Sequence, residues 1–530
     1  MSLATARAET LAARRDAAGS VAASQAEAAL AIERANTAAA AERRSATALR
    51  DQVAAAQERS AAERAESRVR ACAVGRLSLG GAAIAARNMH YHRVVGGLSA
   101  RPTFEHFVLG ARLGAGANAV AFSATHELSG IEVAMKVMYM LNAADEDATD
   151  PLIAANIRDF ELLSLQSRLH AAAAPGDPTT HWGIFVLPVF TLFSTILTED
   201  LARDMERLDV LRDVMEVIGR KTLAIVTPLM GPSLEVLLDL RRGARPRVAP
   251  LEPRAWALIA LQLAKGLARC HAQWVVHRDI KPDNVLLARG LWPHCAPGMD
   301  DLGWAGGDDT LALVADFGES LNCLRGDACS FRLGDRPAGN PGSLSPECSR
   351  AAAVGTAIVD YSGQDAWAFG CLLWRMASAD GGPGSRPFPG NGQDPWRSRD
   401  GNYVAPDMRG WPAELARAAG SIVRDLLRVE LPARATLMGT VERLEVLLFV
   451  LMEPPRARGG GAAALDVRLE EVRDAAIAIC DGAAAAAPAA AAAAAAGAPR
   501  VTVAQSLLVD FAGSPRCDAR RVRELLAALG

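Results

Sequence analysis

The pattern of apolar and polar residues separates the two ends of the chain from its middle. Residues 1–75 consist mostly of Ala, Arg, Glu and Ser, with isolated large apolar residues that keep no strict heptad. We expect one or two long solvated helices there, able to self-associate, with a marginally stable or disordered arm as the open alternative. Residues 76–104 contain glycine pairs among mixed polar residues, which predicts a linker.

The other end of the chain, residues 451–530, is also biased in composition. It contains a run of three glycines and, at 483–496, a tract made almost entirely of alanine, which indicates low-complexity sequence. Helices are expected at 464–480 and 516–529. No function follows from this tail.

Between these ends, residues 105–450 have the periodicity of a folded domain. In residues 131–137, Val133, Met135 and Val137 alternate with Ala134 and Lys136. A strand with this alternation buries one face and presents an ammonium group beside a small alanine on the other. The apolar run 223–226 predicts a second, buried strand. Beyond residue 252 the apolar residues recur at helical spacing instead.

A polar loop between two apolar pairs carries the clearest candidate chemistry. Residues 275–287 read Val-Val-His-Arg-Asp-Ile-Lys-Pro-Asp-Asn-Val-Leu-Leu. Asp279 can accept the proton of an attacking hydroxyl, Lys281 can neutralise charge on a transferred phosphate, and Asn284 can hold a metal ion through its amide oxygen.

Two further motifs lie on either side of this loop. Upstream, Gly114 and Gly116 lie in a strand–turn–strand pattern, where glycine lets backbone amides approach phosphate oxygens. Downstream, the short apolar run 311–315 ends in Asp316-Phe317-Gly318, which places a carboxylate at the end of a buried strand.

These motifs, in this order, resemble those of the eukaryotic-type protein kinases, and Lys281 resembles the Ser/Thr branch. The resemblance implies an α+β, two-lobed protein kinase fold with a helical N-terminal extension. A small lobe with an antiparallel sheet and one helix would occupy about 105–226, and a large, mainly helical lobe about 231–450. The implied reaction is transfer of the ATP γ-phosphate to Ser or Thr hydroxyls of protein substrates.

The resemblance also assigns roles to residues in this sequence. Asp279 would be the catalytic base, with Lys281 and Lys136 on the phosphates and Glu161 pairing with Lys136. Asn284 and Asp316 would hold Mg²⁺. The nucleotide pocket would be formed by Gly114, Gly116, Ala121, Ala134, Lys136, Thr227, Met230 and Leu286, with Thr227 as gatekeeper and Met230 as the donor to adenine.

The sequence departs from the family pattern at three positions. Ala119 replaces the third glycine of the loop, Ala121 replaces the usual Val over the adenine, and Asn340 replaces a Thr that normally bonds the catalytic Asp and Lys. A catalytically weak, ATP-binding scaffold that acts through partners is therefore the alternative function. The resemblance further suggests that Arg278 captures a phosphate on Ser330 in the activation segment, against a plain solvated serine.

The composition indicates which kinds of binding partner and which cellular compartment to expect. The 530 residues carry a net charge of −3, so no nucleic-acid partner is expected. No stretch of 18 apolar residues is free of charge, Pro and Gly, so no membrane span is expected. The nine cysteines are odd in number and scattered, which indicates reduced thiols in the cytoplasm or nucleus. The Arg- and Ser-rich N-terminus leaves an organelle transit peptide as an alternative.

One compositional bias bears on the site itself. Lysine occurs only at positions 136, 221, 265 and 281, which leaves 57 − 4 = 53 arginines. An ammonium is a compact point charge, whereas a guanidinium is a wide planar fork. Two of the four lysines therefore stand where the resemblance requires an ammonium.

Overall fold

A computed structural model describes the chain over part of its length. The described residues are 104–115, 119–127, 130–138, 179, 182–196, 221–244, 247–289, 305–322, 330–332, 342–354, 358–381, 385–388, 403–452, 502–512, 520–522 and 524–525. The predicted N-terminal helices, the linker up to residue 103 and the helix expected at 464–480 lie outside these residues.

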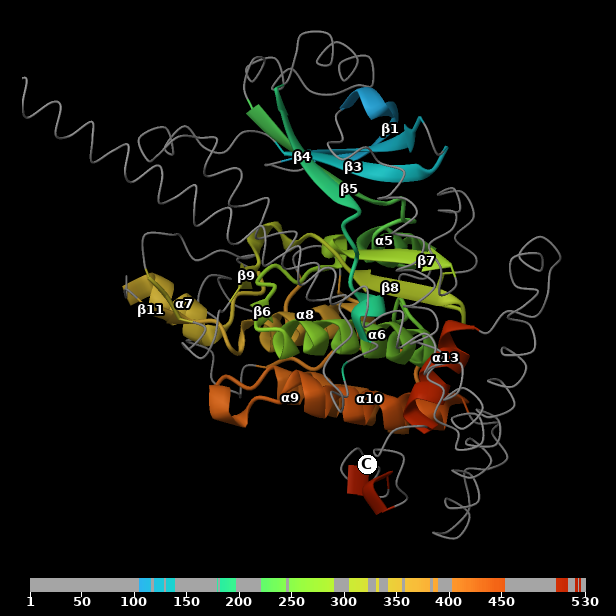
Figure 1. Cartoon of the computed structure of the whole chain (residues 1–530). Coiled ribbons are helices and arrows are strands. Elements are labelled where there is room, and N and C mark those ends of the chain that lie inside the picture. Colours follow the sequence, from blue (N-terminus) through green and yellow to red (C-terminus); the bar gives the residue numbers. More distant parts are fainter. Residues whose placement is uncertain are drawn as a thin grey trace, which may run out of the picture. The chain divides into compact units, whose positions relative to one another are not determined.

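The first part of the fold is a five-stranded antiparallel sheet (Figure 1). A short 3-10 helix, η1 (Phe104–His106), leads into it. The strand order is β1-β2-β3-β5-β4, and the strands are β1 (Phe107–Ala115), β2 (Ala119–His126), β3 (Glu132–Met138), β4 (Thr191–Ile196) and β5 (Lys221–Pro228).

One face of this sheet forms a small hydrophobic core, as the alternation in β3 predicted. Val133, Met135 and Val137 are buried there. Aromatic residues from η1 and β1 close the core, because the rings of Phe104 and Phe107 lie 5.4 Å and 6.0 Å from the ring of Phe193 on β4. Lys136 lies on the other face of the sheet, which does not form this core.

The second part of the fold is mainly helical. Its helices are α5 (Leu234–Ala244), α6 (Pro253–Ala272), α7 (Pro346–Val354), α8 (Gln364–Ala377), α9 (Ala413–Leu426) and α10 (Leu437–Met452). Helix α6 is at its centre: it begins with a proline at the first turn and is buried from residue 255 to 270. Gly266 lets the 3-10 helix η3 (Trp182–Phe185) pack closely, since a Cβ there would lie 2.8 Å from the carbonyl oxygen of Phe185.

Short strands and 3-10 turns connect these helices and bring the polar segments together. They are β6 (Val275–Val276), η5 (Pro282–Asn284), β7 (Val285–Arg289), β8 (Thr310–Val314), η6 (Phe317–Glu319), β9 (Leu321–Asn322), β10 (Ser330–Arg332), β11 (Ile358–Asp360) and η9 (Leu431–Ala433). β7 and β8 are antiparallel, with Val285 opposite Val314. This register places Asn284 at the same end of the ribbon as Asp316.

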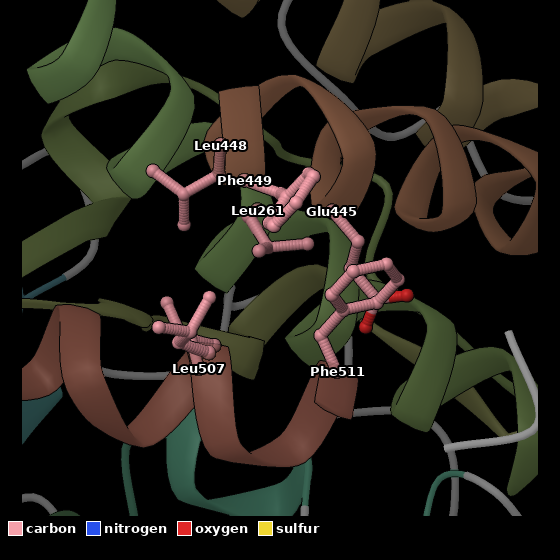
Figure 2. A pocket seen from close by; sticks show the side chains of 7 residues that line it. Leu261, Glu445, Leu448, Phe449, Leu507 and Phe511 are labelled. Atoms are coloured by element: carbon pink, nitrogen blue, oxygen red, sulfur yellow. The ribbon is translucent and has the colours of Figure 1, made fainter. Parts of the chain in front are cut away.

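The hydrophobic core includes a helix that lies beyond residue 450, the expected end of the domain. Helix α13 (Val503–Ala512) contributes Val503, Leu507 and Phe511 to the same core as α6 and α10. Figure 2 shows Leu507 and Phe511 lining one pocket with Leu261, Glu445, Leu448 and Phe449. The physical reason is that the apolar side chains of α10 would otherwise face water. Of the helix expected at 516–529, the described residues 520–522 and 524–525 are helical.

The described residues show neither a membrane-spanning helix nor a disulfide bond. None of the described helices combines the length and the apolar character that crossing a bilayer requires. The cysteines within the described ranges, Cys270, Cys348 and Cys371, are free thiols.

Candidate active site

Asp279 is the centre of a polar cluster that follows β6. The ammonium of Lys281 donates to its Oδ2 atom at 2.7 Å, and the Asn284 amide donates to the same oxygen at 2.8 Å. The Asn284 amide also donates to the backbone carbonyl of Asp279 at 2.8 Å. The side chain of Asp279 is thus held in one orientation by a cation and an amide, and this carboxylate is available to accept a proton from a hydroxyl.

The backbone before Asp279 is fixed by a buried carboxylate. Asp365, at the first turn of α8, accepts hydrogen bonds from the amide nitrogens of His277 at 2.7 Å and Arg278 at 2.8 Å. His271, in the last turn of α6, lies 2.9 Å from the same carboxylate through Nε2. These contacts hold Arg278 in the left-handed region, with φ of 69°, a conformation that non-glycine residues adopt rarely.

The pKa of Asp365 reflects this environment. Burial acts to raise the pKa, but the hydrogen bond and charge of His271 and the contacts with His277 outweigh it, so the pKa lies below its usual value. His271 is not among the residues that the sequence singled out. The only sequence signal for it is a histidine in the last turn of the helix that precedes the loop.

Asp316 joins the two parts of the fold. The ammonium of Lys136 on β3 lies 2.6 Å from Asp316 Oδ1, and both side chains are partly exposed. Asp316 has φ of 62°. Its neighbours are fixed on both sides: the Ala315 amide donates to the carbonyl of Asn284 at 2.9 Å, and the Phe317 ring packs edge-on against His277 at 4.8 Å.

The residues predicted to surround a nucleotide share one face of the sheet. Ala121 lies opposite Lys136 and Gly114 in adjacent strands, and Ala134 lies opposite Thr227. Since opposite residues in antiparallel strands point to the same face, these positions form one continuous surface around the lysine. A Cβ built on Gly114 meets no atom within 4 Å, so this part of the surface is open.

The segment after β5 carries this surface to the helical part. Met230 is buried and Leu286 on β7 is half-buried, both at the edge of the large core. Backbone hydrogen bonds join the two segments, from the Gly231 amide to the carbonyl of Leu287 at 2.9 Å and from the Leu287 amide to that of Pro232 at 3.0 Å. Glu161, Gly116 and Asn340 lie outside the described residues, so their predicted roles stay predictions.

The donor set suits a small divalent cation. Asn284 offers an amide oxygen and Asp316 a carboxylate, which are the hard oxygen ligands that Mg²⁺ prefers. The hydrogen bond from the Ala315 amide to the Asn284 carbonyl keeps Asn284 next to the residue that precedes Asp316. Within the described residues, no cluster of three His, Cys, Asp or Glu side chains offers another metal site.

The activation segment is described only in part. Ser330 lies in β10, in register with Asp360 of β11. The Arg278 guanidinium donates to the Glu319 carbonyl and lies 5.3 Å from the ring of Tyr361. The sequence-based prediction that Arg278 captures a phosphate on Ser330 stays a prediction.

Part of the chain is similar to known proteins. The family model described as "Protein kinase domain" matches residues 211–444. Human "Serine/threonine-protein kinase PINK1, mitochondrial" is 30% identical over 188 residues, which cover 34% of this chain and 28% of that protein. "Serine/threonine-protein kinase PkaA" of Streptomyces coelicolor is 30% identical over 183 residues, covering 33% of this chain and 25% of that protein.

A plant relative matches over a shorter segment. "Cyclin-dependent kinase B1-1" of Arabidopsis thaliana is 38% identical over 71 residues, which are 13% of this chain and 22% of that protein. The chain therefore spans about a quarter of the length of these curated relatives. On the family match, the relatives and the assembled site, the chain carries a eukaryotic-type protein kinase domain of the serine/threonine branch.

Proposed function

We propose that this chain is a serine/threonine protein kinase that transfers the γ-phosphate of ATP to hydroxyl groups of protein substrates. The observation that carries the proposal is the arrangement of four polar side chains. Asp279 is held by Lys281 and Asn284, and Lys136 reaches Asp316 from the sheet. Phosphoryl transfer depends mostly on positioning and charge stabilisation, and these residues supply both.

In the proposed reaction, each side chain acts at a stated atom. The Asp279 carboxylate orients the substrate hydroxyl and accepts its proton as the oxygen bonds to the γ-phosphorus. The bond from phosphorus to the β,γ-bridging oxygen breaks, and ADP leaves. Lys281 neutralises charge on the transferred group, and Lys136 neutralises charge on the remaining phosphates. Mg²⁺, when held by Asn284 and Asp316, would supply further charge neutralisation of the phosphates.

A second function is favoured by specific residues. Ala119 and Ala121 lie at the start of β2, where the family pattern has glycine and a larger side chain. A looser cover over the nucleotide would suit a weak enzyme that acts as an ATP-binding scaffold. The intact set of Lys136, Asp279, Asn284 and Asp316 favours catalysis, so we propose the kinase as the main function.

Partners and location follow the same proposal. The substrates would be proteins with Ser or Thr hydroxyls, with no nucleic-acid partner. Self-association would run through residues 1–75, which lie outside the described part. The location would be cytoplasmic or nuclear, with an organelle transit peptide as the alternative. The word "mitochondrial" belongs to the name of the human relative.

The proposal is tested by phosphotransfer from radiolabelled ATP with Mg²⁺ to a protein acceptor such as dephosphorylated casein. We expect label on Ser and Thr, none on Tyr, and loss of label in the Asp316→Ala variant. Binding of ATP·Mg²⁺ without any transfer would support the scaffold instead. Absence of both binding and transfer would contradict the two functions together.

A further inference from the structure

Gln364, the first residue of α8, joins two backbone groups that lie far from it in sequence. Its side-chain amide donates to the carbonyl of Ser343 at 3.1 Å and accepts from the amide nitrogen of Ser345 at 2.8 Å. The residue is completely buried. One side chain thus satisfies a donor and an acceptor of the same short segment, which fixes both the position and the orientation of residues 343–345.

The next residue in the chain holds the catalytic loop. Asp365 accepts from the amides of His277 and Arg278, which lie two residues and one residue before Asp279. Consecutive residues at the beginning of one helix therefore hold two different loops. Their relative position depends on a single turn of α8.

This turn of α8 is itself anchored. The Arg434 guanidinium donates to the carbonyl of Gly363 at 3.0 Å and to Glu347 at 2.6 Å. A Cβ on Gly363 would lie 2.5 Å from the Arg434 guanidinium, so a larger residue here would have to displace that group. The anchor on α7 is continuous with the segment that Gln364 holds, since the Ser349 amide in α7 donates to the carbonyl of Ser345 at 2.8 Å.

We propose that Gln364 is a positioning residue for the protein substrate. By the proposed function, residues 343–345 end the activation segment, where the substrate peptide binds. Gln364 would set this segment at a fixed distance from Asp279, and so place the acceptor hydroxyl in line with the carboxylate. Small misplacement of reacting groups lowers transfer rates by up to about 100-fold. The inference rests on the proposed function and adds to it the coupling between substrate segment and catalytic loop.

The experiment separates transfer to a peptide from transfer to water. In full-length protein, Gln364→Glu keeps the size and one acceptor but removes the donor to Ser343 O, and Gln364→Leu removes both bonds. We expect kcat/KM for casein to fall about 10- to 100-fold, while ATP hydrolysis without casein and the affinity for ATP·Mg²⁺ change less than about twofold. Asp365→Asn is the contrasting variant, in which both casein phosphorylation and ATP hydrolysis fall.

Hydrogen exchange gives a readout that does not need activity. The Ser345 amide should exchange faster in both Gln364 variants than in the wild type, with unchanged exchange at His277 and Arg278. Equal losses of casein phosphorylation and ATP hydrolysis, or unchanged exchange at Ser345, would overturn the inference. If the wild-type chain transfers no phosphate, the proposed function fails, and exchange at Ser345 then still decides whether Gln364 fixes the segment.

Discussion

Lys136 and Asp316 are 180 residues apart in sequence, yet their side chains meet at 2.6 Å. The first lies on β3 of the sheet and the second follows β8 in the helical part. Both are partly exposed, at 31% and 39%, so the pair contributes little to stability. A contact that stabilises little but joins an ammonium to a carboxylate that we propose binds Mg²⁺ points to a role in chemistry.

Replacement of Lys136 tests that role with the chain's own preferred cation. Lys136→Arg keeps the positive charge but replaces a compact ammonium with a wide planar guanidinium. We expect phosphotransfer to fall by about 100-fold or more, because the charge is no longer held at the position that stabilises the phosphates. The measurement is kcat/KM for ATP. Lys221→Arg, at the first residue of β5, is the matched control and should behave as wild type. Wild-type transfer by Lys136→Arg would mean that the lysine does not contact the phosphates.

The ion pair between Arg434 and Glu347 should be important for stability. Arg434 donates to both Glu347 oxygens, at 2.6 Å and 2.9 Å, and the side chains are 1% and 17% exposed. Removing one partner leaves a buried charge, so Glu347→Leu should lower the unfolding free energy by about 3–5 kcal/mol in urea denaturation. Arg520→Ala breaks an exposed pair with Glu524 and should cost less than about 0.5 kcal/mol. Similar losses of unfolding free energy for Glu347→Leu and Arg520→Ala would contradict the prediction that the buried pair stabilises the fold more than the exposed one.

The tail helix α13 should be required for a stable domain. Leu507 and Phe511 are buried against α6 and α10, so Phe511→Ala should lower the unfolding free energy by about 3–5 kcal/mol. Leu508→Ala, at a half-buried position of the same helix, should lower it less. A chain shortened to residues 105–450 should be less stable than the full chain. Equal stability of the two would show that α13 does not contribute to the core.

How far the sequence predicts this molecule differs from feature to feature. The face of β3 follows from a period of two, which is a local property, and the structure confirms it. The family resemblance assigned Lys136 and Asp316 to one site but paired Lys136 with Glu161, so the contact of Lys136 with Asp316 was not predicted. No local pattern encodes a contact across 180 residues. Helix α13 had a readable signal, since Val503, Leu507 and Phe511 recur at intervals of four. We did not predict this helix, and expected helices in the tail only at 464–480 and 516–529.

Gln364 had no such signal. Its partners are backbone atoms of Ser343 and Ser345, about twenty residues away. Backbone groups are the same in every residue, so the sequence does not mark which ones a buried amide will bind. Only the packing of α8 against the activation segment reveals the contact.

The buried Asp365 predicts a specific pH dependence of stability. Its pKa is lower in the folded chain than the usual value of 3.8, so it stabilises the fold when ionised. That contribution is fully present above about pH 5 and is lost as the pH falls through the folded-state pKa. The difference in unfolding free energy between wild type and Asp365→Asn should therefore be constant from about pH 5 to 7 and shrink below pH 3.8. A difference that grew on acidification would contradict the lowered pKa.

The central claim is that Asp279 acts as the base of a working kinase, and one measurement on Asp279→Asn tests it most directly. The substitution keeps the size of the side chain but removes the proton acceptor. Single-turnover transfer from ATP·Mg²⁺ to casein should fall by about 100- to 10,000-fold, while calorimetric affinity for ATP·Mg²⁺ stays within about threefold of wild type. Transfer by Asp279→Asn at the wild-type rate would contradict the account.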